Sequence, residues 1–180
     1  MNNKILIGSI IVLMVVLLSI SVSSVSADSN STSILTLSKG GIVINYPSDW
    51  GYSEATSNES IMAISKLSSI DSAGVGQVNI NVEKKPIEGG DFYTFVNDTY
   101  KSMQYDSNYK LISSGDVMVG DIQALQYFYT SVQDGVEREH KAVWFEKGGQ
   151  AYVLLYSAPP NEFESNLYVF DFILSDMQIT

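Results

Sequence analysis

The chain has 180 residues, and its 10 lysines and arginines against 20 aspartates and glutamates give a formal net charge of −10. This balance argues against nucleic-acid binding, which needs clustered basic side chains to displace phosphate counterions. It also argues against adsorption to anionic lipid headgroups. Because there is no cysteine, disulfides, thiolate catalysis and thiolate zinc sites are excluded, and the core must supply the stability.

The first 27 residues are typical of a secretory signal peptide. A short charged start is followed by an almost unbroken apolar run, Ile5–Leu18, and by a serine-rich stretch that ends in Val25-Ser26-Ala27. These are the three parts of such a signal, including a small-residue cleavage site. The alternative is an uncleaved anchor, because Ile5–Val25 is just long enough to cross a bilayer. Either interpretation places the remaining chain outside the cytoplasm, secreted or attached to the cell surface.

A polar linker, residues 28–33, leads into one expected domain, residues 34–180. Three Asn-x-Ser/Thr sequons, at Asn30, Asn58 and Asn97, are candidate glycosylation sites in an organism that glycosylates secreted proteins. Asn97 projects away from the apolar stripe of its expected helix, so we expect its side chain at the surface.

The first part of the domain predicts strands that could extend a central sheet. Apolar runs on both sides of Ser38–Gly41 indicate a hairpin, Pro47–Gly51 a turn, and Ile61–Lys66 a further strand. Polar and apolar residues alternate through Val75–Glu83, which predicts a strand with one solvated face or an edge strand. In that strand the residues expected inward are Val78, Ile80 and Val82, and those expected outward are Gln77, Asn79, Asn81 and Glu83.

From Asp91 the apolar period changes to that of a helix, whose stripe consists of Phe92, Phe95, Val96, Thr99, Tyr100 and Met103. Four strands are then expected, at Lys110–Val119, Ile122–Val132, Ala142–Lys147 and Ala151–Ser157. The last two form a hairpin, and its second arm is so apolar that we expect it at the centre of the sheet. A final amphipathic helix ends near Ser175. Strands joined by tight turns are antiparallel, so the pattern predicts an α+β fold with apolar cover on both faces of the sheet's centre.

The sequence contains no evident catalytic apparatus, and we do not expect an enzyme or a cofactor. His140 is the only histidine, and no Gly-x-Ser-x-Gly nucleophile elbow is present. The candidates for a divalent metal are Glu137, Glu139 and His140. On a strand, however, the two carboxylates point to one face and the imidazole to the other. The alternative is a solvated, charged strand end.

Three segments carry a family resemblance: the run Ile44–Trp50 with its Tyr-Pro-x-x-Trp turn, the hairpin around Gly120-Asp121, and Gln150–Tyr156 leading into Pro159–Phe163 and the last helix. Over about Ile42–Met177 the chain resembles the PsbP-like family. The resemblance implies an α-β-α sandwich, in which helices flank both faces of an antiparallel sheet, and a non-enzymatic role. Some members bind divalent cations, but no ligand motif carries over to this chain. The signal and sequons are typical of a prokaryotic surface protein, an archaeal one being one option.

Two functions are therefore expected from the sequence. The first is an extracytoplasmic module that binds, assembles or stabilises a protein or cell-envelope partner through loops at the sheet ends. The alternative is a protein that binds a small ligand or a divalent cation, which the acidic charge and the tyrosine-rich interior favour. Neither function involves nucleic acid, and membrane contact is expected only through Ile5–Val25 if that segment stays uncleaved.

Overall fold

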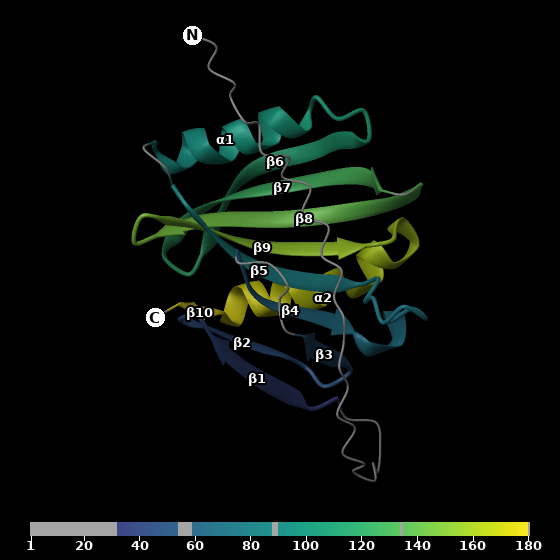
Figure 1. The fold of residues 1–180 in the computed structure, drawn as a ribbon. Coiled ribbons are helices and arrows are strands. Elements are labelled where there is room, and N and C mark those ends of the chain that lie inside the picture. The colour runs from purple at the N-terminus through teal and green to yellow at the C-terminus, as the bar shows by residue number, and fades with distance from the viewer. Residues whose placement is uncertain (1–31, 54–58, 88–89, 134, 180) are drawn as a thin grey trace.

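The computed structural model describes residues 32–53, 59–87, 90–133 and 135–179. This part of the chain forms two antiparallel sheets and two α-helices (Figure 1). The larger sheet has seven strands in the order β3-β4-β5-β9-β8-β7-β6, and the smaller one has the order β1-β2-β10. Every pairing between these strands is antiparallel, which confirms the predicted α+β class.

The strands and helices have the following bounds. The smaller sheet consists of β1 (Ile34–Lys39), β2 (Ile42–Pro47) and β10 (Gln178–Ile179). The larger sheet consists of β3 (Trp50–Ser53), β4 (Ser60–Lys66), β5 (Asn79–Pro86), β6 (Tyr109–Val119), β7 (Ile122–Gln133), β8 (Val136–Lys147) and β9 (Gln150–Ala158). The helices are α1 (Phe92–Met103) and α2 (Pro160–Asp176), and a 3-10 turn covers Leu67–Ser69.

The hairpin of β8 and β9 forms the centre of the large sheet, as the sequence predicts. Its turn contains Gly148 and Gly149, both with positive φ, 60° and 72°, which suits the tight turns that connect twisted strands. β9 lies between β5 and β8, and its Leu154 is 0% exposed. An interior position explains why this arm is so apolar, because both of its faces are covered.

Helix α1 buries most of the apolar stripe that its sequence predicts, and α2 buries a face that includes Phe163 and Phe170. The Asp91 side chain caps α1 by accepting a hydrogen bond of 3.0 Å from the Thr94 backbone N–H. The residues of α1 that are buried are Phe92, Val96, Thr99 and Tyr100, and those of α2 are Phe163, Asn166, Val169, Phe170 and Ile173. Asn97 is exposed, as expected for its place outside the apolar stripe.

The core consists of two hydrophobic clusters, and β8 contributes alternate residues to each. Ala142 and Trp144 belong to the cluster that includes α1 residues, whereas Val143 and Phe145 belong to the cluster that includes α2 residues. Because successive side chains of a strand point to opposite faces, the centre of the sheet is apolar on both sides.

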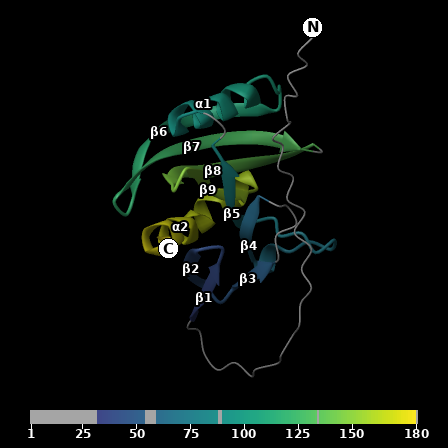
Figure 2. The ribbon, with the colours of Figure 1, turned by 60° about the vertical axis from the view of Figure 1, so that its left-hand side comes forward.

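Two features of the amino-terminal part differ from the prediction. The hairpin of β1 and β2 does not extend the central sheet but pairs with β10, and Figures 1 and 2 show β2 next to α2. Asn45 Nδ2 donates to Asp176 Oδ2 at 2.5 Å, which connects β2 to the end of α2. The predicted turn at Pro47–Gly51 is shorter, and β3 begins at Trp50, whose side chain is 1% exposed and part of the core.

The predicted solvated face of the strand around Val75–Glu83 is wrong for two residues. Val78, Ile80 and Val82 are buried as expected, but Asn81 and Glu83 are also buried, at 3% and 2% exposure. The buried Lys85 side chain shares this face, with its Nζ 3.5 Å from Glu83 Oε2. β5 also lies between β4 and β9, so it is not the edge strand that the alternation allows. The alternation of polar and apolar residues on β5 therefore belongs to a buried strand with one polar face.

Other sequence predictions fall partly or wholly outside the described residues. These are the signal peptide or anchor, most of the linker 28–33, and the sequons at Asn30 and Asn58. Within the described ranges, neither helix has the length and apolar character needed to cross a membrane.

Candidate functional site

The three residues predicted as metal candidates lie at the start of β8, and the structure does not bring them together. His140 lies opposite Tyr129 of β7, with the ring centroids 4.5 Å apart, and its Nε2 is 2.8 Å from Ser131 Oγ. Alternation along the strand directs Glu137 and Glu139 to the other face. No group of three histidine, aspartate or glutamate side chains placed to hold a metal occurs in the described part of the chain.

His140 is held as a neutral imidazole. Burial, and after it the positive charge of Arg138, lowers the pKa of His140 to about 3. Its Nδ1 is enclosed and has no hydrogen-bond partner. Arg138 donates from Nε to Ser157 Oγ at 2.9 Å and from Nη1 to Gln77 Oε1 at 3.1 Å. An imidazole with so low a pKa is a poor general base, so this geometry does not form a catalytic dyad with Ser131.

Acidic residues gather where β8 and α2 begin. Burial, followed by the negative charges of Glu164 and Glu137, raises the pKa of Glu139. Glu164 belongs to the first turns of α2, whereas Glu137 and Glu139 belong to β8. Their mutual repulsion shows that the two elements bring like charges close together, and like charges held together favour a cationic partner.

Exposed apolar side chains lie at the same end of the sheet. Val132 at the end of β7 is 38% exposed, Val136 at the start of β8 is 52% exposed, and Tyr105 between α1 and β6 is 85% exposed. The Val132 N–H donates to the Asn108 carbonyl at 3.1 Å, which joins β7 to the connection that contains Tyr105. Figure 1 shows the end of β7, the start of α2 and the α1–β6 connection on one side of the molecule.

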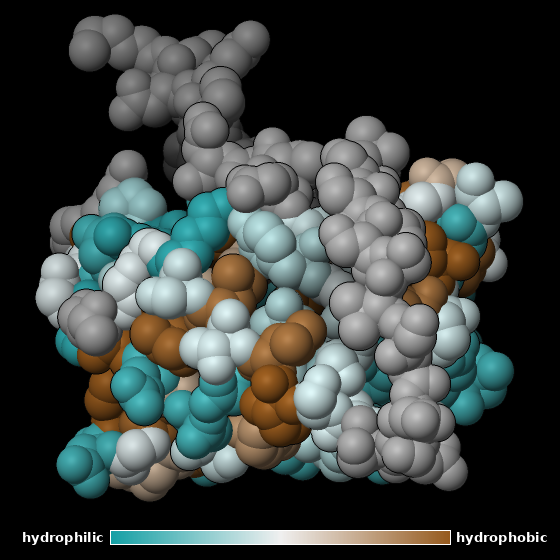
Figure 3. Space-filling model, turned by 90° about the horizontal axis from the view of Figure 1, so that it is seen from below, coloured by the Kyte–Doolittle hydropathy of each residue, from teal (hydrophilic) through white to brown (hydrophobic). Residues whose placement is uncertain are grey.

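We call this surface the hairpin end, because it lies at the turn that joins β7 to β8. It consists of Tyr105, Val132, Val136, Glu137, Glu139 and Glu164. Exposed apolar residues also occur elsewhere, including Ile34 and Leu35 on β1 and Tyr168 on α2. The view from below, the side on which β1 and β2 lie in Figure 1, shows small apolar patches separated by hydrophilic side chains (Figure 3). The hairpin end differs because its apolar residues adjoin a cluster of carboxylates.

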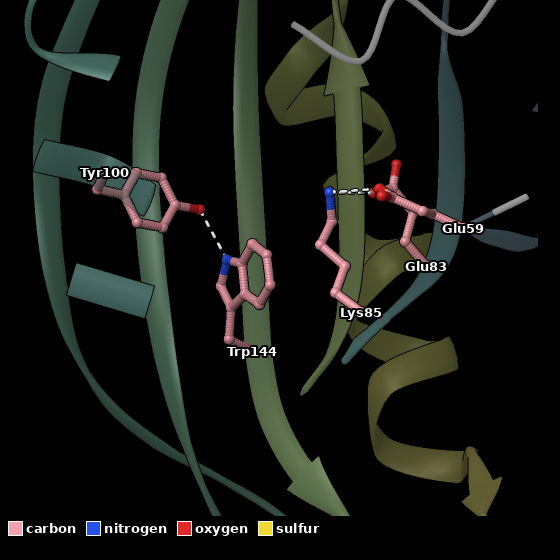
Figure 4. A network of polar contacts seen from close by, with 5 residues as sticks. All are labelled: Glu59, Glu83, Lys85, Tyr100 and Trp144. Atoms are coloured by element: carbon pink, nitrogen blue, oxygen red, sulfur yellow. Dashed lines mark hydrogen bonds and ion pairs between the residues drawn. The ribbon is translucent and has the colours of Figure 1, made fainter. Parts of the chain in front are cut away.

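A second site lies on the large sheet, and we call it the polar half-face. It consists of Ser53 on β3, Ser65 on β4, and Asn81, Glu83 and Lys85 on β5, all of which are no more than 6% exposed. Lys85 Nζ lies 2.8 Å from Glu59 Oε2 and 3.5 Å from Glu83 Oε2 (Figure 4). Burial raises the pKa of Glu83, although the positive charge of Lys85 opposes this effect.

Strand register places the polar half-face on the same side of the sheet as the aromatic cluster beneath α1. Glu83 pairs with Val153 of β9, and Val153 pairs with Trp144 of β8. Residues directly opposite each other in neighbouring strands share a face. Trp144 Nε1 donates to the Tyr100 hydroxyl at 2.9 Å (Figure 4). One face of the sheet is therefore aromatic under α1 and polar beside it.

The sequence does not predict the polar half-face, although it contains part of the signal. The alternation that includes Asn81 and Glu83 predicts a solvated face, because polar residues on a strand normally meet water. Ser53 and Ser65 carry no signal of their own, since their neighbours in the sheet come from distant parts of the chain.

These features define an α+β protein with an antiparallel sheet, a polar region on one sheet face and an acidic, partly apolar end. The sequence profile of PsbP-like proteins matches residues 5–178. The chain therefore belongs to the PsbP-like family, as its sequence motifs indicate. None of the curated protein sequences matches this chain.

Solved structures confirm the fold. The cyanobacterial PsbP protein CyanoP from Synechocystis sp. PCC 6803 is 16% identical, with a TM-score of 0.59 over 87% of this chain and 98% of its own. LpqN from Mycobacterium tuberculosis, involved in cell envelope biogenesis, is 16% identical, with a TM-score of 0.60 over 84% of this chain and 92% of its own. A protein of unknown function from Pseudomonas aeruginosa, PA94, is 10% identical, with a TM-score of 0.53 over 79% of this chain and 94% of its own. At these identities the likeness shows the fold, and function has to be argued from the sites of this chain.

Proposed function

We propose that this protein is a non-enzymatic extracytoplasmic binding module that docks on a protein partner in the cell envelope through the hairpin end. The observation that carries the proposal is that exposed apolar side chains and three acidic side chains lie at one end of the sheet, where Val132 pairs with Glu137. The signal-like first 27 residues and membership of the PsbP-like family support an extracytoplasmic, non-catalytic role. The description of LpqN as a protein of cell envelope biogenesis is consistent with it.

The chemistry of the hairpin end indicates which partner it fits. Exposed Tyr105 and Val136 offer apolar area, and tyrosine is enriched at the centres of protein interfaces. Glu137, Glu139 and Glu164 add negative charge to a chain whose formal net charge is already −10. The complementary surface is apolar with basic side chains around it, and opposite charges of this kind speed association and fix orientation.

We infer further that the two helices lie on opposite faces of the large sheet, as in an α-β-α sandwich. The supporting observation comes from β8, whose successive side chains point to opposite faces of the sheet. Ala142 and Trp144 belong to the hydrophobic cluster of α1, whereas Val143 and Phe145 belong to the cluster of α2. In such a sandwich the protein's own helices occupy the centres of both faces. A partner then meets the ends and edges of the sheet, and the hairpin end is one of these.

The experiment is affinity capture with the secreted protein from a cell-envelope extract, followed by purification of the captured partner and measurement of its dissociation constant. We expect Val136→Asp and Tyr105→Ser to weaken binding about tenfold or more, because each removes apolar area from the interface. The matched control is Tyr168→Ser, which removes an aromatic side chain that is 62% exposed on α2. Equal binding by all three variants would refute the hairpin end as the docking surface.

Salt provides a second test of the same proposal. Screening by added salt should weaken the purified complex, because its electrostatic part acts between exposed charges. Glu137→Lys should weaken the complex and should make its affinity less dependent on salt, because the substitution removes an attractive charge and adds a repulsive one. An affinity that is independent of salt and unchanged by Glu137→Lys would exclude a basic partner.

A second candidate function is the binding of a small ligand or cation. The observation that favours it is the set of unpartnered polar atoms in the polar half-face, whose ligand chemistry is argued below.

A further inference from the structure

The polar half-face contains buried polar atoms that have no hydrogen-bond partner. They are Ser53 Oγ, Ser65 Oγ, Asn81 Oδ1 and Glu83 Oε1. His140 Nδ1 on β8 is also unpartnered, and it lies on the same face of the sheet as these atoms. Buried polar atoms are nearly always hydrogen-bonded in folded proteins, so each exception needs an explanation. Several exceptions on one face indicate that the protein's own side chains do not complete the hydrogen bonding of this region.

These atoms occupy one continuous area. Ser53 pairs with Ala63, and Ala63 pairs with Asn81, so the row runs across three neighbouring strands. Strands are spaced about 4.8 Å apart and residues two apart on a strand about 7 Å, so Ser53, Asn81 and Glu83 span about 10 Å by 7 Å. Ser65 is in register with Asn79 and extends the row to about 14 Å. A single metal ion holds its ligands at about 2.0–2.6 Å and cannot satisfy atoms spread this widely. An area of this size instead suits a small organic molecule.

The charges within the area decide which molecule fits. Glu83 and Glu59 are negative, Lys85 is positive, and the Lys85 ammonium already contacts both carboxylates. Two of the unpartnered atoms, Glu83 Oε1 and Asn81 Oδ1, are acceptors when the carboxyl group is ionised. The local deficit is therefore one positive charge and two or more hydrogen-bond donors. A protonated primary amine supplies both, because an ammonium group carries one charge and three donors.

We propose that the polar half-face binds a small organic amine in its protonated form. Its ammonium group donates to Glu83 Oε1 and Asn81 Oδ1, and its remaining polar group meets the hydroxyl of Ser53. The side chain of Glu59 is 53% exposed, so the region reaches solvent beside the Lys85–Glu59 pair, which places the entrance there. This proposal does not depend on the hairpin end.

The test is an NMR titration of the uniformly ¹⁵N-labelled secreted protein with ethanolamine, using choline as the matched control. Ethanolamine and choline carry the same charge and hydroxyl group, but the trimethylated nitrogen of choline cannot donate hydrogen bonds. We expect saturable shifts of the amides of Ser65, Asn81 and Glu83 with ethanolamine, and at least about tenfold weaker binding of choline, because hydrogen bonds to a buried carboxylate are strong. Equal binding of both compounds, or shifts that do not saturate, would overturn the proposal. So would Ca²⁺ alone if it reproduced the ethanolamine pattern.

Variants locate the site. Glu83→Gln keeps the shape of the side chain and removes its charge, so ethanolamine binding should be lost. The control Asp116→Asn removes an exposed carboxylate from the same sheet and should leave binding unchanged. If the amide spectrum shows that Glu83→Gln does not fold, Ser53→Ala serves instead and should weaken binding severalfold. Unchanged binding in the folded variant would show that ethanolamine binds elsewhere.

The two proposals fail independently. Val136→Asp should leave the ethanolamine titration unaltered, and Glu83→Gln should leave capture of the envelope partner unaltered. If each variant loses only the binding assigned to its own surface, the hairpin end binds the partner and the polar half-face binds ethanolamine.

Discussion

The Trp144 indole N–H donates to the Tyr100 hydroxyl at 2.9 Å, and both side chains are 4% exposed. This hydrogen bond joins α1 to β8 inside an aromatic cluster. The Tyr100 ring stacks on Tyr127 with the ring centroids 3.6 Å apart, and it meets Tyr129 and Trp144 edge to face. Aromatic packing supplies most of the buried area, but the hydrogen bond gives the helix a directional contact with the sheet.

Tyr100→Phe should therefore destabilise the fold by about 1–3 kcal/mol, because it keeps the ring and leaves the buried Trp144 N–H without an acceptor. Urea denaturation measures the change. The control is Tyr105→Phe, at a tyrosine that is 85% exposed, where we expect a change within about 0.5 kcal/mol. If Tyr100→Phe costs the same in a Trp144→Phe background as in the wild type, the hydrogen bond does not explain the loss.

The features that sequence predicts well here are those decided by neighbours along the chain. The hairpin of β8 and β9, the cap and stripe of α1, and the tight turn before β7 all depend on short-range patterns, and the structure contains each of them. Periodicity and turn residues carry this information because they act within a few positions.

The features that sequence misses depend on contacts between distant segments. Asn81 is buried on a strand whose polar and apolar residues alternate, and no local pattern distinguishes this from a solvated face. β10 has only two residues and forms because β2 offers its edge at the end of α2. The acidic cluster of the hairpin end joins Glu137 to Glu164, which lie in different elements. Each of these features can be predicted only when the tertiary arrangement of the elements is known.

Leu154→Asp should abolish folding. Leu154 is 0% exposed on the central strand β9, and an aspartate there would bury an unpaired carboxylate at a cost of about 4 kcal/mol or more. Circular dichroism and the yield of purified protein measure the outcome. Leu154→Met conserves volume and should cost less than about 1.5 kcal/mol. A folded Leu154→Asp protein with a melting temperature like that of the wild type would contradict the central position of β9.

His140 should make the protein sensitive to acid. Its pKa is lowered to about 3 in the folded state, so between pH 6.5 and pH 3 the unfolded chain binds a proton that the folded chain does not. Stability attributable to this residue is therefore complete above pH 6.5 and falls as the pH decreases through that window. The lost stability should be on the order of 1–3 kcal/mol by pH 4.

Urea denaturation of the wild type and of His140→Gln at several pH values measures this contribution. The difference in unfolding free energy between the two proteins should be constant above pH 7 and should move in favour of the variant as the pH falls. A difference that stays constant down to pH 4 would mean that His140 is protonated in the folded protein.

Gly76→Ala should destabilise the fold by about 1–3 kcal/mol through overpacking above the polar half-face. A Cβ atom at position 76 would lie 2.3 Å from both Cβ and Oγ of Ser65, and Ser65 is 0% exposed and cannot move aside freely. Because the clash involves that side chain, Ser65→Gly should recover part of the loss in the double variant. Gly115→Ala is the control, since an added Cβ there meets nothing within 4 Å, and its effect should stay within about 0.5 kcal/mol. Equal effects of the two alanine substitutions, measured by urea denaturation, would mean that the loop before β5 does not lie on Ser65.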